Sequence, residues 1–389
     1  MKYFWLSVVS TFLLLTALCQ TTTPKEFRGV WIATVNNIDW PRPATTNADE
    51  QKASFIALLN MHQRNGINAV FVQIRPTADA FYPSSKEPWS QWLTGQQGVA
   101  PTPYYDPLSF MINETHKRGM QFHAWFNPYR ATQSLNSSQL TATHIIRQHP
   151  EWFITYGDKK YFDPGNKQVQ QYVAGIVKDV VTRYQIDGVH LDDYFYPYKI
   201  PGKTFADDVS FRQYGNGLGR DAWRRSNVDS LIALLYKTIK SVDKKCRFGV
   251  SPFGVWRHIA ADPMGSETKR SQTNYDDLYA DVLLWLRKGW VDYVIPQLYW
   301  EIEHKNLSFN TLVDWWATHT YGKDCYIGIG YYRAGETAGW RSPTQVPRQI
   351  QKIRSTPGIK GMSFYSSSIF EKNPYGWNDS LRLNYFKKP

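Results

Sequence analysis

Residues 187–194 read Asp187-Gly188-Val189-His190-Leu191-Asp192-Asp193-Tyr194, a short β-branched and apolar run that ends in two adjacent acids. A run of this kind is typical of a buried strand in a parallel sheet. Similar runs recur along the chain, and each is followed by a longer amphipathic stretch. This alternation predicts a series of βα units packed on one parallel sheet.

The strand-like runs number eight. They cover residues 28–35, 68–74, 121–126, 188–191, 247–251, 293–298, 326–330 and 361–365. The helix candidates between them cover residues 48–65, 107–118, 167–184, 225–242, 276–288, 310–319 and 344–355. Eight strands with seven or eight helices predict an α/β protein of the (β/α)8 TIM-barrel class, with a parallel eight-stranded barrel and elaborated βα loops.

An open, doubly wound sheet is the competing architecture for the same alternation of strands and helices. Its usual phosphate-binding glycine loop is absent after the first strand-like run. No low-complexity linker divides residues 24–375, so we expect one barrel over this span. Residues 376–389 are expected to form a C-terminal extension packed on the barrel.

The composition favours a carbohydrate ligand. Aromatic residues make up 16% of the chain, with 16 Trp and 25 Tyr, and rigid faces with a polar tip suit stacking against sugar rings. Aromatic surfaces also serve protein partners. The net charge of +12 is scattered and includes no run of five Lys or Arg, which argues against a nucleic-acid partner.

The first nineteen residues have the form of an export signal. Lys2 supplies the charge, an apolar run follows from residue 3 to residue 15, and the run is too short to span a membrane. Cys19 leaves two alternatives open, which are lipidation at this residue and cleavage after it. Either predicts an exported protein of the periplasm or cell envelope, attached to a membrane only through a lipid on Cys19.

Two cysteines remain beyond this signal, Cys246 and Cys325, and each begins an apolar run. Two buried free thiols are therefore expected rather than a disulfide. The pattern indicates no metal site and no cofactor.

Polar residues close nearly every strand-like run, where a TIM barrel carries its chemistry. Glycosidic cleavage usually needs two carboxyl groups, and these strand ends supply four candidates: Asp79, Asp192, Asp193 and Glu301. Alternation along a strand puts His190 and Asp192 on one face, whereas Asp193 turns aside unless the strand has already ended.

Each of these acids except Asp192 also has a plain structural interpretation. Asp193 can cap the following loop, Asp79 can pair with Arg75, and Glu301 can be a solvated loop residue. Asp192 is the strongest catalytic candidate, because burying a carboxylate without a role or a partner is costly.

A second group of residues suits sugar hydroxyls and sugar rings. The predicted binding residues are His190, Arg75, Asn127, Arg130, Tyr194, Trp256, Gln297, Tyr299, Trp300 and Tyr365. His190 can instead be a hydrogen-bonded core histidine, and core packing is an alternative for any one of the aromatic residues.

Seven motifs in succession, residues 26–31, 73–76, 126–130, 162–165, 187–194, 251–257 and 296–300, closely resemble the glycosyl hydrolase-like 10 family. The resemblance spans nearly the whole chain beyond the signal. It implies a TIM-barrel envelope protein whose relatives look like hydrolases of peptidoglycan glycan strands stripped of their peptides.

The Asp187–Asp192 segment is also similar to the fourth-strand motif of amylase-type barrels, where the last Asp is the nucleophile. The His190–Asp193 segment looks like that of exopolysaccharide-processing hydrolases, which use the first Asp of such a pair. Both likenesses imply a catalytic role for Asp192. The amylase-like acid would follow the fifth strand, but Gly254 and Arg257 occupy that place, so the second carboxyl stays open among Asp79, Glu301 and Asp193.

These observations together predict an exported glycoside hydrolase that acts on a bacterial glycan, most simply peptide-free peptidoglycan strands. Two other hypotheses fit the same sequence. One is a carbohydrate-binding barrel without catalytic activity, and the other is an envelope scaffold for protein partners.

Overall fold

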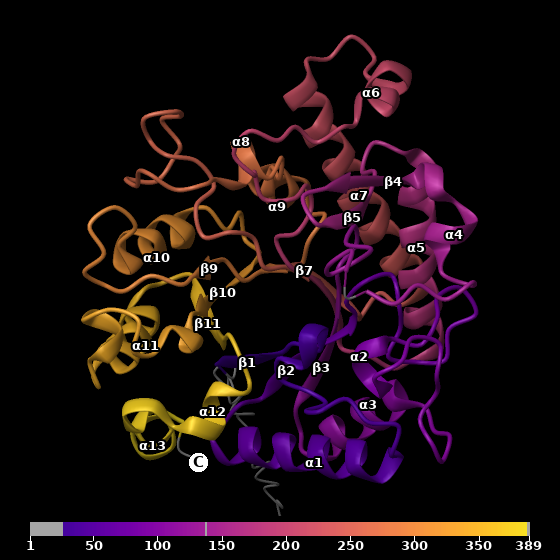
Figure 1. The fold of residues 1–389 in the computed structure, drawn as a ribbon. Helices are drawn as coiled ribbons and strands as arrows, with labels where there is room; N and C mark the ends of the chain where they lie inside the picture. Colours follow the sequence, from indigo (N-terminus) through magenta and orange to yellow (C-terminus); the bar gives the residue numbers. More distant parts are fainter. Residues whose placement is uncertain (1–25, 137, 387–389) are drawn as a thin grey trace, which may run out of the picture.

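The computed structural model describes residues 26–136 and 138–386. The main sheet runs in the order β11-β1-β2-β3-β6-β7-β8-β10-β9, and β10 also pairs with β11, which closes it into a barrel. All of these pairings are parallel (Figure 1). The strands are β1 (Phe27–Ile32), β2 (Ala69–Arg75), β3 (Gln121–Phe126), β6 (Gly188–Leu191), β7 (Arg247–Val250), β8 (Tyr293–Val294), β9 (Gln297–Leu298), β10 (Asp324–Ile329) and β11 (Ile359–Phe364). The predicted TIM barrel is confirmed.

The sixth strand of the barrel differs from the expected single run. It consists of β8 and β9, which both pair with β10 but are separated by Ile295 and Pro296. Pro296 has no N–H to donate to a neighbouring strand, and this interrupts the ladder. The barrel therefore has eight strand positions built from nine strands.

The long helices surround the sheet (Figure 1). They are α1 (Ala48–Arg64), α3 (Pro107–Lys117), α5 (Lys167–Arg183), α7 (Arg220–Val242), α9 (Val282–Lys288), α10 (Phe309–Thr318) and α11 (Gln345–Ser355). Side-chain caps fix several starts: Asn47, Asp106 and Asn166 accept backbone N–H groups from the first turns of α1, α3 and α5. The apolar faces of these helices lie against the outside of the barrel and form the main core.

Two helix predictions were wrong at their boundaries. Helix α7 begins at Arg220, five residues before the predicted start. The stretch predicted as one helix over 276–288 is divided into α8 (Asn274–Asp277) and α9. Tyr279 between them has a positive φ of 54°, which breaks the helix, and Asp281 then caps α9 by accepting from the Leu284 N–H.

The connections carry extra structure, as the predicted elaborated loops require. They hold the short helices α2 (Gln91–Thr94), α4 (Ile145–Gln148), α6 (Asp208–Tyr214), α12 (Ile369–Lys372) and α13 (Trp377–Ser380). An antiparallel hairpin of β4 (Phe153–Tyr156) and β5 (Lys159–Phe162) lies in the connection between β3 and β6. This hairpin builds one side of the barrel mouth (Figure 1).

The barrel interior is filled by a separate aromatic cluster. It contains Phe27, Trp31, Phe71, Trp125, Tyr293 and Tyr326. The Tyr293 ring crosses the interior at Gly249, where a Cβ atom would come within 2.2 Å of the ring. The lower barrel is thus packed solid, and open space remains at the carboxyl ends of the strands.

The described part of the C-terminal extension packs on the barrel wall. Phe386 is buried with its ring 6.4 Å from that of Phe364 on β11, and Trp377 donates to the Pro343 carbonyl. Cys246 and Cys325 are buried free thiols, as expected. The predicted signal peptide and Cys19 lie outside the described residues. Within 26–136 and 138–386, no helix has the length and apolar character needed to cross a membrane.

Candidate active site

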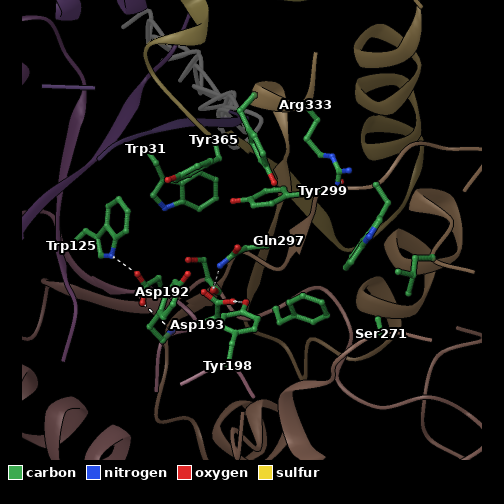
Figure 2. Close-up of a pocket in the computed structure, with 16 residues that line it drawn as sticks. Trp31, Trp125, Asp192, Asp193, Tyr198, Ser271, Gln297, Tyr299, Arg333 and Tyr365 are labelled. Carbon is green, nitrogen blue, oxygen red and sulfur yellow. Dashed lines mark hydrogen bonds between the residues drawn. The ribbon is translucent and has the colours of Figure 1, made fainter. Parts of the chain in front are cut away.

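A cavity of about 480 Å³ opens at the barrel mouth, where the carboxyl ends of the strands converge (Figure 2). Asp192 and Asp193 follow β6 directly and lie side by side on its floor. Most of the remaining lining comes from other strand ends and the loops after them: Trp31, Trp125, Tyr194, Tyr198, Ser251, Phe253, Ser271, Gln297, Tyr299, Trp300, Leu307, Tyr332, Arg333 and Tyr365.

Both acids face the cavity because β6 ends at Leu191. Beyond it the chain turns, and the Tyr194 N–H donates to Asp192 Oδ1 at 3.0 Å. Strand alternation therefore no longer governs Asp193. Because the strand has ended before Asp193, this residue also faces the barrel mouth. The two carboxyl groups form an adjacent, buried pair.

Asp192 is held by donors on one side of the pair. The Trp125 indole N–H donates to Asp192 Oδ2 at 3.1 Å, and the Asn127 amide donates to the same oxygen. Burial raises the pKa of Asp192, while the nearby Arg130 charge and these hydrogen bonds oppose the rise. The donors favour the ionised form of this carboxyl group.

Asn127 is itself fixed by two further donors. Its Oδ1 accepts from Gln73 Nε2 and from Arg130 Nη2, each at 2.6 Å, so its amide N–H₂ must point toward Asp192. Gln73 in turn accepts from the backbone N–H groups of Thr34 and Val35 at 2.9 Å. This chain of hydrogen bonds from β1 through β2 and β3 sets the orientation of the Asp192 carboxylate.

Asp193 has different neighbours. The Tyr198 hydroxyl donates to Asp193 Oδ2, and the Gln297 side chain also hydrogen-bonds this carboxyl group (Figure 2). Burial and the adjacent Asp192 charge raise the pKa of Asp193 to about 7, against an ordinary value of 3.8. Asp193 is thus protonated in a large fraction of the molecules near neutral pH.

His190 lies beneath the pair as a neutral residue. Trp31 Nε1 donates to His190 Nε2 at 3.3 Å, and an indole N–H can only donate, so Nε2 carries no proton. His190 Nδ1 then donates to the Tyr293 hydroxyl at 3.2 Å. Burial lowers the pKa of His190 well below 6.5. The core-histidine interpretation describes its contacts, and the residue supports two cavity side chains, Trp31 and Ser251.

Aromatic rings form two walls of the cavity (Figure 2). On one side Tyr299 and Tyr365 stack with ring centroids 5.9 Å apart, and Trp31 lies 6.2 Å from Tyr365. On the other, Phe253 meets Trp300 edge-on at 5.5 Å. Apolar walls with a polar acid floor form a site that can hold a sugar ring over the two carboxyl groups.

The profile of the glycosyl hydrolase-like 10 family matches residues 26–340. The chain belongs to this family. Glycosyl hydrolase YngK of Bacillus subtilis (strain 168) is 44% identical over 390 residues, which cover 98% of this chain and 76% of that protein. Glycosyl hydrolase DigH of Escherichia coli (strain K12) is 40% identical over 383 residues, 91% of this chain and 85% of its own. The protein is a glycoside hydrolase, and the predicted family is confirmed.

Solved structures agree on the fold. The PgaB (BpsB) glycoside hydrolase domain from Bordetella bronchiseptica aligns over 94% of this chain and 100% of its own, with a TM-score of 0.56 and 12% identity. The catalytic domain of β-amylase from Paenibacillus polymyxa aligns over 93% and 99%, with a TM-score of 0.58 and 12% identity. At this identity the likeness concerns the barrel alone.

Two of the four candidate acids lie away from the cavity. Asp79 is fully buried in the loop after β2, where it accepts from the Thr77 N–H at 3.1 Å, and burial raises its pKa to about 6. Glu301 is half-buried and accepts from the Thr337 hydroxyl at 2.5 Å. Of the four candidate acids, Asp192 and Asp193 are therefore the two that line the cavity at the barrel mouth.

Some of the expected binding residues line the cavity and others do not. Tyr194, Gln297, Tyr299, Trp300 and Tyr365 line the cavity. Behind that lining lie His190 and Asn127, and Arg130 lines a neighbouring pocket.

Two of the expected binding residues, Arg75 and Trp256, do not line the cavity. Arg75 is buried in an ion pair with Glu87, Nη2 to Oε1 2.6 Å, and not with Asp79 as the sequence interpretation allowed. Trp256 stacks with Trp315 at 6.2 Å on the helical side of the structure.

Several cavity residues were not predicted. Tyr198 lies in an irregular loop without a periodic pattern, and nothing in the sequence ties it to Asp193. Trp31 in the lining, and Gln73 behind it, could have been found from alternation, since both are inward positions near the ends of the first two strands. Among the described residues, no group of three His, Cys, Asp or Glu side chains is arranged to hold a metal ion.

Proposed function

We propose that the protein is an exported hydrolase that cleaves glycosidic bonds in peptide-free peptidoglycan strands, with Asp192 and Asp193 as its catalytic carboxyl groups. The observation that carries the proposal is the adjacent pair of buried acids with unlike surroundings between aromatic walls. The motif resemblance to envelope hydrolases supports the substrate class. The charged and apolar start of the chain supports export to the periplasm or cell envelope.

The environments of the two acids assign their roles. Asp193 keeps a proton near neutral pH, so it donates that proton to the glycosidic oxygen as the bond breaks. The hydrogen bonds that Trp125 and Asn127 donate to Asp192 oppose the effect of burial and favour its ionised form, which can attack the sugar carbon as nucleophile or activate water as base. Two carboxyl groups whose environments differ are the arrangement that acid and base roles require.

The experiment is to incubate the purified protein with peptidoglycan strands freed of peptides and to detect new reducing ends by mass spectrometry. We expect new ends from the wild type and none from Asp192→Asn, with strand binding kept in the variant. Asp49→Asn, which changes an exposed carboxyl group in the first turn of α1, is the control and should behave as wild type.

Unchanged turnover in Asp192→Asn would contradict the catalytic assignment. Absence of new ends from the wild type would contradict the proposed substrate. Absence of any strand affinity would favour a different glycan altogether.

A further inference from the structure

A second pocket of about 260 Å³ adjoins the active-site cavity. The two share Tyr194 and Tyr198, so the second pocket begins where the wall beside the acid pair ends. Its other side is the β4–β5 hairpin, which contributes Tyr156, Asp158, Lys159 and Tyr161. A sugar unit placed over Asp192 and Asp193 can therefore extend a substituent past Tyr194 into this pocket.

The pocket contains a buried cation, Arg130, which is 7% exposed. Its Nε donates to the Pro76 carbonyl at 3.1 Å, Nη2 to Asn127 Oδ1 at 2.6 Å and Nη1 to Gln133 Oε1 at 3.4 Å. All three acceptors are neutral groups. The guanidinium also lies 5.2 Å from the centre of the Tyr194 ring. These contacts orient the group without neutralising it.

No carboxylate of the described residues lies within 4.0 Å of the Arg130 guanidinium nitrogens. Burial raises the pKa of Asp192 and the positive charge of Arg130 opposes that rise, but the two side chains form no ion pair. An arginine has five N–H donors, and three of those on Arg130 have acceptors. A buried guanidinium that lines a pocket, makes no ion pair and has two N–H groups without an acceptor among the described residues is suited to an anionic ligand.

Lys159 adds a second positive charge at the rim of the pocket. Lys159 and Tyr161 lie two residues apart on β5 and line the pocket together, whereas Lys160 between them lies on the other face and donates to Thr155. Lys159 forms an ion pair with the exposed Asp158 at 3.2 Å, so its charge is partly shared. Arg130 is thus the main anion-binding group.

We propose that this pocket binds the free carboxylate of an acidic sugar next to the bond that is cleaved; this inference rests on the proposed function. In a peptide-bearing strand that carboxyl group is an amide and has no charge. Removing the peptide exposes a carboxylate that can form a two-point contact with Arg130. The pocket therefore selects stripped strands by their charge.

The test compares stripped strands with the same strands after chemical reduction of their carboxyl groups to alcohols. The wild type should show a kcat/KM about 10- to 100-fold higher for the carboxylate form, the range for hydrogen bonds to a charged group. Arg130→Gln should abolish this ratio, although its activity on both forms will also change because Arg130 contacts Asn127. Lys159→Gln should reduce the ratio, and Lys160→Gln should leave it unchanged.

Equal kcat/KM for the two forms in the wild type would overturn the proposal while leaving the proposed function intact. If neither form is cleaved, the proposed function fails, and equilibrium binding of the two forms then decides the inference. A binding preference for the carboxylate form that disappears in Arg130→Gln upholds it, and equal affinity overturns it.

Discussion

Replacing Asp193 with Asn should stabilise the protein at alkaline pH while removing its activity. In the folded protein burial and the Asp192 charge raise the pKa of Asp193 to about 7, whereas the unfolded chain has the ordinary value of 3.8. The folded state therefore binds a proton that the unfolded state has already lost. The contribution of this group to stability is fully present below about pH 4 and is lost as the pH rises to about 7.

The magnitude follows from the same pKa difference. Each pH unit between these two values corresponds to about 1.4 kcal/mol, so the native Asp193 loses about 4 kcal/mol over the whole range. Between pH 5 and pH 8 the loss is about 2–3 kcal/mol. Asn carries no charge and its oxygen can still accept from Tyr198, so the variant avoids this loss.

The assay is equilibrium unfolding in urea at pH 5 and pH 8, with the free energies of unfolding compared between wild type and Asp193→Asn. The advantage of the variant should grow by about 2–3 kcal/mol between the two pH values. Asp158→Asn changes an exposed carboxyl group and should show no such growth. A stability difference for Asp193→Asn that stays constant from pH 5 to pH 8 would refute the reasoning.

Three further predictions concern activity and stability. The kcat on stripped strands should fall about tenfold per pH unit above about pH 7, where Asp193 loses its proton. It should also fall at low pH, where Asp192 gains a proton. A kcat that does not change with pH would contradict the acid and base roles of the two residues. Asn127→Ala should lower kcat about 100-fold, because Asp192 loses the side chain that orients it, and turnover assays at saturating substrate would show this. Glu87→Gln should destabilise the protein by about 3–5 kcal/mol in urea unfolding, because it leaves the Arg75 charge buried without its partner; an unchanged midpoint would contradict this.

The fold could be predicted from the sequence because each strand carries its own signal. The runs at 68–74 and 121–126 agree with β2 and β3 to within a residue at each end. Such runs are apolar because both faces of a barrel strand are covered, and this is a local property of the chain. The boundary of α7 and the break before α9 were missed, since Tyr279 adopts a conformation that its residue type does not signal.

The site could be predicted only in part, because local pattern says which residues follow a strand but not what they meet. Arg75 ends β2 as expected, yet its side chain forms an ion pair with Glu87 in the next loop. Trp256 follows β7, yet its partner is Trp315 on α10. Both partners are brought close by folding alone, and each turns a strand-end residue away from the cavity.

Asp192 and Asp193 show the same division between local and tertiary information. The sequence places two chemically identical acids next to each other after β6, and only strand alternation and the motif likenesses distinguish them. The structure separates them by their neighbours: Trp125 and Asn127, both from the β3 end, donate to Asp192, while Tyr198 and Gln297 contact Asp193. Because Asn127 also accepts from Arg130, the side chain that orients Asp192 lies between that acid and the second pocket. The groups proposed to cleave the glycan and to recognise its charge are therefore held by one hydrogen-bonded unit.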